Sequence, residues 1–327
     1  MARELALSVI VPAYEVAPFV RQAVESALEQ SMGDLEVIAV EGESSDGTFE
    51  QLATIRDGRL RILRHRNQGL AYARNLGLEA ARGRHIGFLD GDDLWKPAKP
   101  ERHVEFLEAH PETDLTFSLS ATIDEAGREV GFLRTHAPGP VSFRELFVAS
   151  PVGNGSAVIA RRESLERAGR FDVALPYFED VDLWLRVARL RPGNIACIPK
   201  VLTLYRRRRG QLTSDWRPLE AAWQQLREKV ARYAPEEVAG TEAATERARR
   251  LYFAFLLYEQ REYAQAARFL RASCRMDPRA ALQDSRTWLL AAACWSGLLL
   301  PPRLHRLVMN WACSCQRRIM RMLHPRL

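Results

Sequence analysis

The sequence predicts an α/β protein, with a parallel, doubly wound sheet in the first part of the chain and an all-helical region after it. Short apolar runs rich in β-branched residues alternate with helical stretches over residues 1–90, and from about Arg217 onward the pattern is helical throughout. Strands separated by helices of this length favour a parallel sheet, because each connection must cross back over it.

The expected elements follow the chain in a regular order. Leu7–Pro12 is a β-branched, apolar run typical of a buried strand, and Pro18–Gln30 carries its apolar side chains on one helical stripe. Turn residues at Ser44–Thr48 lead into another helix. The other elements expected here are strands at Leu35–Val40, Leu60–His65 and His85–Asp90 and a helix at Gly69–Ala81. Because ligands of such sheets bind beyond the carboxyl ends of the strands, the ends of the first, second and fourth strands form the expected site.

Beyond residue 111 the pattern is more mixed. The expected elements are a strand and hairpin at 114–133, helices at 161–169 and 179–190, and a strand at Ile195–Arg206. We therefore place a domain boundary near residue 215, with an α/β domain at 1–214 and a helical region at 215–327. Within that region, Phe255–Pro278 resembles one tetratricopeptide-type helix pair, which must pack on neighbouring helices.

The composition is that of a globular protein, with 47% apolar and 27% charged residues. The five cysteines are odd in number and lack metal-ligand spacing, which favours a reducing compartment. No charged-then-apolar leader precedes the first strand, so a cytoplasmic location without a signal peptide is expected. No acidic residue follows Asp284 although seven arginines do. A basic patch at one end indicates a local partner and argues against a nucleic-acid-binding domain.

Three carboxylates follow the fourth apolar run. Asp90, Asp92 and Asp93 lie within four residues, where like charges repel. One interpretation is a polar transition that caps the next helix, since aspartate is favoured in turns. The other is a divalent-cation site, because Mg²⁺ or Mn²⁺ accepts carboxylate oxygens together with substrate phosphates and relieves the repulsion. The position after a fourth α/β strand favours the cation site.

Four stretches of the chain together resemble the family 2 glycosyltransferases of the GT-A fold. They are residues 7–30, 44–48, 67–93 and 169–188, and they occur in the family's order and spacing. The resemblance covers about residues 5–210 and implies a Rossmann-like domain for nucleotide-diphosphate sugars. It implies transfer of the sugar to an acceptor hydroxyl with inversion, on a glycan or lipid-linked acceptor, in cell-surface polysaccharide or glycolipid assembly.

The resemblance also assigns residues to the donor and to a metal. Asp92 matches the metal-holding residue of the family's DxD motif, with Asp90 near the ribose or the metal, and the implied cofactor is Mg²⁺ or Mn²⁺. The implied donor-binding residues are Pro12, Ala13, Tyr14, Glu41, Asn67, Gly69, Arg74, Asp90 and Arg206. For Arg74 and its neighbour Asn75, a structural role is the alternative, and Gly69 suits the backbone geometry of a helix entry.

Glu179 and Asp180 match the family's ED motif, and the resemblance implies that Asp180 is the catalytic base. A base is needed because a sugar hydroxyl is a poor nucleophile until its proton is taken in the transition state. Acids on the first turn of a helix are also favoured by the helix dipole, and both roles are open to this pair. We expect Asp182 to be structural and Asp172 to be a turn or cap residue.

The sequence departs from the family pattern in two places. Gly42 stands where the family commonly has an aspartate that contacts the nucleobase, and Glu41 or Glu43 is the candidate substitute. The nucleotide is therefore open between UDP, GDP and dTDP. The family's usual histidine is absent from Arg206–Arg209. Arginines at these positions could bind the donor diphosphate, because guanidinium geometry matches phosphate. The alternative is that the four arginines form a solvated loop. Without a Gln-x-x-Arg-Trp element or a block of membrane spans, a processive synthase is not expected.

The end of the chain leaves two pairs of alternatives. Trp288–Leu300 has 13 residues, short of the roughly 20 that span a bilayer, so it is either a core helix or an interfacial one. The arginine-rich tail after it suits an anionic membrane surface, on the cytoplasmic face of the inner membrane, or else forms a core helix with a basic face. A second function class, favoured by Gly42, is a catalytically silent nucleotide-sugar-binding or scaffold protein.

Overall fold

A computed structural model describes residues 5–132, 139–208, 210–212, 215–301 and 303–305. The chain separates into two compact units. The first unit contains Met1–Leu146 and Ser150–Arg208, and the second contains Phe147–Ala149 and Arg209–Leu327. The domain boundary after residue 214 stays a prediction.

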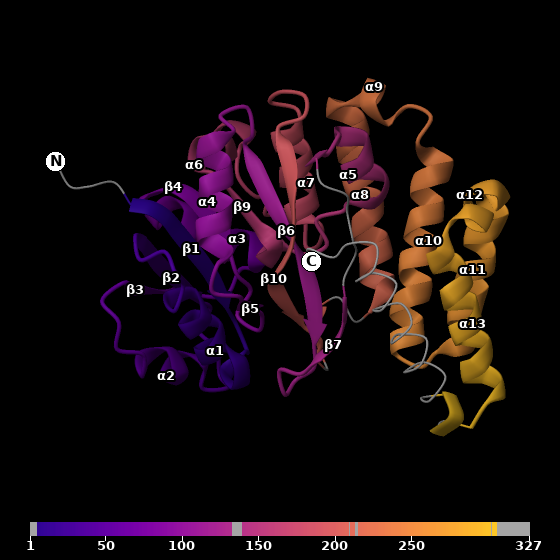
Figure 1. Cartoon of the computed structure of the whole chain (residues 1–327), viewed down its shortest axis with the longest axis horizontal. Helices are drawn as coiled ribbons and strands as arrows, with labels where there is room; N and C mark the ends of the chain where they lie inside the picture. The colour runs from indigo at the N-terminus through magenta and orange to yellow at the C-terminus, as the bar shows by residue number, and fades with distance from the viewer. Residues whose placement is uncertain (1–4, 133–138, 209, 213–214, 302, 306–327) are drawn as a thin grey trace. The chain divides into compact units, whose positions relative to one another are not determined.

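The first unit is built on one mixed sheet (Figure 1). Its strands are β1 (Leu5–Ala13), β2 (Leu35–Glu41), β3 (Leu60–Arg64), β4 (Gly83–Phe88), β5 (Leu94–Trp95), β6 (Leu115–Ile123), β7 (Glu129–Phe132), β8 (Gly139–Pro140), β9 (Val158–Arg161) and β10 (Ile195–Arg206). The order is β3-β2-β1-β4-β9-β6-β10-β5, with β7 paired to β6 and β8 to β10. The first four strands are parallel, as the sequence predicts, whereas β9 runs antiparallel to both β4 and β6.

Seven α-helices of the described chain accompany this sheet in sequence order. They are α1 (Ala17–Leu28), α2 (Thr48–Ala53), α3 (Leu70–Ala80), α4 (Lys99–Ala109), α5 (Phe143–Ala149), α6 (Arg162–Ala168) and α7 (Glu179–Ala188). The buried stripe of α1 packs with β1 and β2 in the core, and Asp46 Oδ2 accepts the Ala17 N–H at 2.9 Å at its start. The sequence did not indicate α4, because its inner face buries two polar residues, Lys99 and His103, which obscure the apolar period.

The strand register determines where a ligand site can form. Ala13 at the end of β1 pairs with Glu41 at the end of β2, and Ile10 pairs with Phe88 at the end of β4. The loops after these three strands therefore leave the sheet at the same edge. This is the carboxyl edge, at which parallel α/β sheets bind their ligands.

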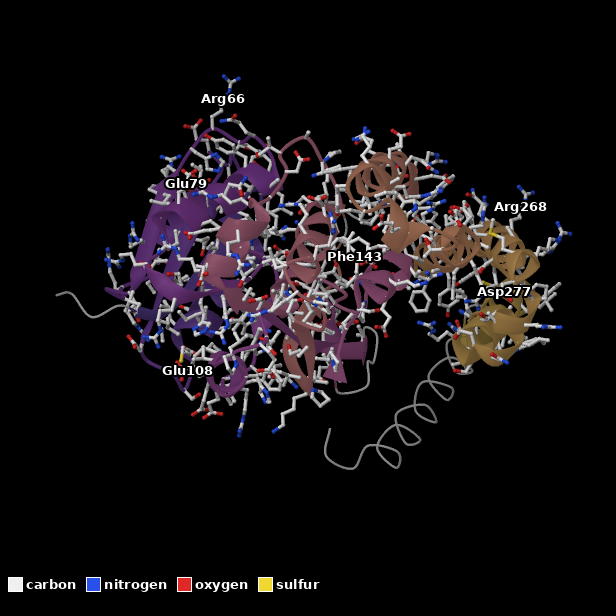
Figure 2. The ribbon with its side chains drawn as sticks, turned by 90° about the horizontal axis from the view of Figure 1, so that it is seen from above. Arg66, Glu79, Glu108, Phe143, Arg268 and Asp277 are labelled. Atoms are coloured by element: carbon white, nitrogen blue, oxygen red, sulfur yellow. The ribbon has the colours of Figure 1, made fainter. Side chains whose placement is uncertain are left out.

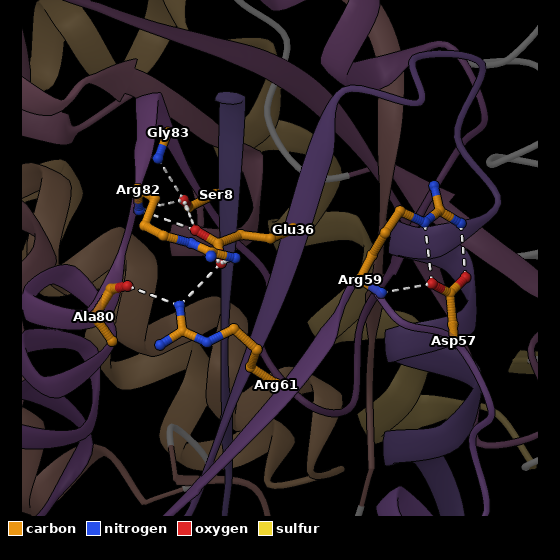
Figure 3. Close-up of polar contacts among 8 residues, drawn as sticks. All are labelled: Ser8, Glu36, Asp57, Arg59, Arg61, Ala80, Arg82 and Gly83. Carbon is orange, nitrogen blue, oxygen red and sulfur yellow. Dashed lines mark hydrogen bonds and ion pairs between the residues drawn. The ribbon is translucent and has the colours of Figure 1, made fainter. Parts of the chain in front are cut away.

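A buried charge network holds the strands together toward the opposite edge (Figure 3). Glu36, near the start of β2, accepts hydrogen bonds from Ser8 Oγ at 2.8 Å, Arg82 Nη2 at 2.7 Å and Arg61 Nη1 at 3.0 Å. Burial alone would raise the pKa of Glu36, but the bonds from Arg82, Ser8 and Arg61 outweigh it and lower the pKa to about 2. Ser8 Oγ also accepts the Gly83 N–H at 2.8 Å, so one carboxylate joins β1, β2, β3 and the start of β4.

The second unit is helical. After Phe147–Ala149 of α5 come α8 (Trp216–Tyr233), α9 (Pro235–Val238), α10 (Glu242–Glu259), α11 (Tyr263–Met276), α12 (Pro278–Gln283) and α13 (Ser285–Leu299). Figure 1 shows α10, α11 and α13 side by side, and they share a core of Ala254, Leu257, Ala266, Leu270, Leu290 and Cys294. Over residues 255–278 the chain forms the end of α10 and then α11, and the tetratricopeptide-type identity of this pair stays a prediction. In the part of the chain that the structure describes, no helix is both long enough and apolar enough to cross a membrane.

Candidate active site

The acidic run after β4 is held in place by its own neighbours. Asp93 is fully buried, and its carboxylate accepts the Ser156 hydroxyl at 2.6 Å and the Arg206 backbone N–H at 2.8 Å. Burial, together with the charges of Asp92 and Asp90, raises the pKa of Asp93 well above its usual value. Asp93 therefore anchors the loop, and the carboxylates that keep some exposure are those of Asp90 and Asp92.

Asp92, the residue expected to hold a metal, is paired with an arginine. Arg208 Nε lies 2.6 Å from Asp92 Oδ2. Burial raises the pKa of Asp92, the Arg208 guanidinium opposes this shift, and the charge of Asp90 adds to it. A positive group thus occupies the place where the sequence predicts a cation.

The carboxylates at this edge are of the ligand type that a divalent cation prefers. Among the described residues, no three His, Cys, Asp or Glu side chains form a metal-binding group. Asp90 and Asp92 nevertheless supply the oxygen atoms that Mg²⁺ or Mn²⁺ prefers, and such cations commonly complete their coordination with water and substrate phosphates. The carboxylates of Asp90 and Asp92 therefore match such a cation by ligand type, while Arg208 holds the Asp92 carboxylate in this structure.

Arg74 joins the two acidic motifs. Its side chain is 2% exposed and comes from α3; Nη2 lies 2.8 Å from Asp90 Oδ1, and Nη1 lies 2.5 Å from Glu179 Oε1. Burial alone would lower the pKa of Arg74, but the charges of Asp90 and Glu179 outweigh it and raise the pKa. The adjacent Asn75 exchanges hydrogen bonds with the Phe171 backbone at 2.9 and 3.0 Å. Both residues thus contact other parts of the protein, 16 to 105 positions away in sequence.

The pair Glu179 and Asp180 opens α7, after Phe178 in a left-handed conformation with φ of 60°. Burial raises the pKa of Glu179 to about 7, against the opposing charge of Arg74. Burial also raises the pKa of Asp180, again opposed by Arg74. Asp180 Oδ1 accepts the adjacent Val181 N–H at 2.7 Å. Asp182 is fully buried and lies 2.7 Å from Arg186, in keeping with the structural role expected for it.

The loop after β1 presents an aromatic ring at the same edge. Pro12 and Ala13 are the last residues of β1 and are buried, whereas Tyr14, which follows them, is 49% exposed. A Cβ atom at Gly42 would lie 3.1 Å from Tyr14 Cδ2. A side chain at position 42 would therefore require the Tyr14 ring to shift by a few tenths of an ångström.

The neighbouring donor-binding candidates are engaged in local contacts. Glu41 is fully buried, and its carboxylate accepts the Ser44 N–H at 2.7 Å and Arg64 Nε at 3.1 Å. Asn67 Oδ1 accepts the Gly69 N–H at 2.9 Å, and Gly69, with φ of 95°, is the cap of α3. Gly69 thus has the backbone conformation that favours glycine. Glu41 is oriented toward its own loop in this structure.

Arg206, expected to contact the donor, is buried within the loop network. Its Nε donates to the Asp92 carbonyl at 2.7 Å, and its Nη1 donates to two further carbonyls, at 3.1 and 3.0 Å. The arginine that reaches the Asp92 carboxylate is Arg208. Ser156, which no sequence motif marks, donates to Asp93 and accepts the Asp90 N–H at 3.0 Å. Gly155 beside it leaves room for Arg74, since a Cβ there would lie 2.9 Å from Arg74 Nη2.

Comparisons with known proteins identify the family of the chain. The model of the family described as Glycosyl transferase family 2 matches residues 8–169. The putative teichuronic acid biosynthesis glycosyltransferase TuaG of Bacillus subtilis is 30% identical over 230 residues, which cover 68% of this chain and 87% of that protein. Escherichia coli WfaP, named as a UDP-Glc:alpha-D-GlcNAc-diphosphoundecaprenol beta-1,3-glucosyltransferase, is 28% identical over 184 residues, or 55% of this chain and 69% of that protein.

Other relatives are longer, and the solved structures agree in fold. An uncharacterized glycosyltransferase of Rickettsia felis is 26% identical over 57% of this chain, a match that spans 32% of that relative's length. The structure of Staphylococcus aureus TarS in complex with UDP-GlcNAc superposes with a TM-score of 0.61 at 20% identity, covering 84% of this chain and 83% of that one. With the family match and the TuaG relative, these findings establish that the chain belongs to glycosyl transferase family 2.

Proposed function

We propose that this protein transfers a sugar from a uridine-diphosphate sugar to an acceptor hydroxyl, with inversion at the anomeric carbon. The observation that carries the proposal is the Arg74 bridge, which joins Asp90, at the metal motif, to Glu179, in the motif of the base. One buried side chain thus relates a leaving-group site to a proton-accepting site. A displacement reaction needs both sites in a defined relation to each other.

The donor is proposed to lie along the loops after β1 and β2. Tyr14 offers an exposed ring for the nucleobase, and Asn67 lies beside it across Gly42. UDP is preferred over other nucleotides because WfaP carries UDP-Glc in its name and TarS was solved with UDP-GlcNAc. Pro12 and Ala13 would shape the floor of this pocket. Glu41 would support the loop through Ser44 and would not touch the base.

The diphosphate is proposed to lie against Asp90, Asp92 and Arg208. When bound, Mg²⁺ or Mn²⁺ supplies Lewis-acid stabilisation of the leaving diphosphate. Arg208 is paired with Asp92 before the donor arrives and can turn to the phosphate oxygens, because guanidinium geometry matches phosphate as well as carboxylate. Arg206 keeps the loop in shape through its carbonyl contacts.

Asp180 is proposed to act as the base. The acceptor oxygen attacks the anomeric carbon, its proton passes to a carboxylate oxygen of Asp180, and the bond from the anomeric carbon to the diphosphate oxygen breaks with the electron pair staying on the diphosphate. The raised pKa of Asp180 makes it a better proton acceptor than an ordinary aspartate. The charge of Arg74 opposes this rise in pKa and so favours the ionised carboxylate.

The acceptor is proposed to be a glycan or a lipid-linked glycan in cell-surface polymer assembly at the cytoplasmic face of a membrane. TuaG is named for teichuronic acid biosynthesis, and the name of WfaP gives a GlcNAc-diphosphoundecaprenol acceptor. The basic tail at residues 306–327, which lies outside the described residues, is proposed to add attachment to an anionic surface.

A thermal-shift screen with UDP-, GDP- and dTDP-sugars, each with Mn²⁺, Mg²⁺ or a chelator, tests the donor. A ligand that binds the folded state alone raises the melting temperature by mass action, so the UDP-sugar of choice should give the largest rise. If a GDP- or dTDP-sugar raises the melting temperature most, the choice of UDP is contradicted.

Asp180→Asn tests the base and separates an enzyme from a silent binding protein. We expect kcat to fall by about 10²- to 10⁴-fold, with donor affinity within a few-fold of the parent, because the base faces the acceptor. Asp172→Asn, in the loop before α7, is the control, since Asp172 caps the Ala174 N–H and should change kcat little. Asp182 is unsuitable as a control because it is buried and paired with Arg186.

The alternative function is a nucleotide-sugar-binding or scaffold protein without turnover. The observation in its favour is Gly42 in place of the family's aspartate. Donor binding by the parent with neither transfer nor hydrolysis, over a panel of acceptors, would support this alternative.

A further inference from the structure

Helix α13 is apolar on both of its faces. Its inner face contributes Leu290 and Cys294 to the core of the second unit. Its outer face carries Trp288, Ala292, Trp295 and Leu299, whose spacing of four, three and four residues forms one line along an α-helix. We call these four residues the outer stripe. Trp288 is 55% exposed, Trp295 58% and Leu299 72%.

A helix that is apolar all round is normally buried, and exposed clusters of large apolar side chains mark interaction sites. The stripe extends beyond α13 at one end, because Trp288 Nε1 donates to the Leu282 carbonyl at 3.1 Å and Leu282 of α12 is itself 64% exposed. With 15 residues, α13 is about 22 Å long and too short to cross the hydrocarbon core of a bilayer. A bilayer partner would therefore be contacted along the side of the helix.

Arginines outnumber acids in the chain segment that contains the stripe. Residues 263–305 contain six arginines against two acids, Asp277 and Asp284. Asp284 pairs with Arg247 and with Arg286 of this segment, which leaves five of the six arginines outside this pairing. α11 has no acidic residue and exposes three arginines, Arg268, Arg271 and Arg275. Figure 2 shows Arg268 pointing away from the helices. Basic residues close to an anionic lipid surface are attracted to it.

We propose that the outer stripe of α13 docks on an anionic lipid bilayer, with the helix lying in the plane of the membrane and both tryptophans at the headgroup boundary. Tryptophan prefers this boundary because its ring is apolar while its N–H is polar. Buried apolar area together with attraction of basic residues to anionic lipid sets the strength of binding to such a surface, and this segment supplies both an apolar face and arginines. The inference rests on the proposed function in one respect: a lipid-linked acceptor is met at a membrane.

The experiment uses the full chain and measures co-sedimentation with vesicles of phosphatidylcholine alone or mixed with phosphatidylglycerol. Changing Trp288, Trp295 and Leu299 together to glutamine should weaken binding to the anionic vesicles by about tenfold or more, because the apolar contact area is lost. The double change Trp288→Phe and Trp295→Phe keeps an apolar stripe and should keep binding within a few-fold. Val130→Gln, at an apolar residue of β7 that is 52% exposed, is the surface control and should bind as the parent does.

Brominated lipids provide a second readout. They should quench part of the tryptophan fluorescence of the parent. The quenched fraction should be smaller in the Phe variant, because that variant lacks Trp288 and Trp295 at the headgroup boundary. Melting temperatures show whether each variant folds, and all three variants should fold because the changed residues are exposed. Binding to anionic vesicles should weaken at high salt, which screens the arginines.

Three results would overturn the inference. In the first, the parent fails to bind anionic vesicles. In the second, the glutamine variant binds them as the parent does, which would assign binding to residues 306–327. In the third, neither protein binds vesicles, and the parent is a dimer that the glutamine substitutions convert to a monomer. The donor thermal shift is measured on the same samples. If the donor raises the melting temperature but the protein does not bind vesicles, this inference alone is overturned. If the protein binds vesicles but no donor raises its melting temperature, the result counts against the proposed function alone.

Discussion

Replacing Arg74 with methionine should destabilise the protein and disturb both acidic motifs. Methionine has a similar length but no charge, so Asp90 and Glu179 would lose their shared partner. Removing one member of a buried ion pair costs about 3–5 kcal/mol, because the remaining charge stays buried and uncompensated. Arg74 is 2% exposed and the Glu179 side chain 6%, so solvent screens their contact very little, and we expect a loss in this range.

The loss should depend on pH in a defined direction. Burial already holds the pKa of Glu179 at about 7, above its usual value of 4.5, and without Arg74 it should rise further. A carboxyl whose pKa is raised by folding binds more protons in the folded state, so the folded state gains stability as the pH falls. This gain is larger in Arg74→Met than in the parent, because the pKa of Glu179 is raised further in the variant. The deficit of Arg74→Met should therefore be largest near pH 8 and shrink toward pH 6.

Urea denaturation at pH 6 and pH 8, followed by tryptophan fluorescence, measures the free energy of unfolding of the parent and of Arg74→Met. Arg21→Met is the matched control, since it removes the same group from an exposed pair with Glu25 and should change stability by less than about 1 kcal/mol. Arg74→Lys keeps the charge but lacks the two guanidinium nitrogens that contact Asp90 and Glu179. It should therefore be more stable than Arg74→Met but still have a lower kcat than the parent. An Arg74→Met protein within about 1 kcal/mol of the parent at pH 8, or a deficit that does not change with pH, would refute the reasoning.

Three further predictions rest on other contacts. Asp92→Asn should remove the metal dependence of donor binding without unfolding the protein, because an amide is a weaker ligand for a hard cation; donor binding insensitive to both chelator and substitution would contradict this. Glu36→Gln should cost about 3 kcal/mol at pH 7, since the pKa of Glu36 is lowered from 4.5 to about 2. That deficit should disappear as the pH falls from 4.5 toward 2, and an unchanged deficit at pH 3 in urea denaturation would speak against it. Gly83→Ala should cost about 1–3 kcal/mol because its Cβ would meet the backbone of β1, whereas Gly58→Ala, with nothing within 4 Å, should be mild by the same measurement.

The sequence by itself determined the elements that depend on local pattern. Apolar runs and helical stripes predict β1 to β4 and the helical second part, because periodicity is set by the backbone of each element. The parallel order then brings the end of β1 and the run at Asp90 to one edge. The ED pair likewise falls at the start of a helix, as its acids suggest. Beyond β4, however, the antiparallel entry of β9 depends on long-range pairing, which a four-residue strand does not encode.

Only the tertiary structure decided which charges meet. Arg74 and Glu179 are 105 residues apart, so no local pattern relates them. Arg206 and Arg208 look equivalent in sequence, but β10 ends at Arg206 and buries it, while Arg208 beyond the strand reaches the Asp92 carboxylate. The same holds for Trp288–Leu300, whose composition suits a core or an interface equally. Packing buries one side of α13 and leaves the outer stripe exposed, because the side on which a helix finds neighbours is a property of the fold and not of its sequence.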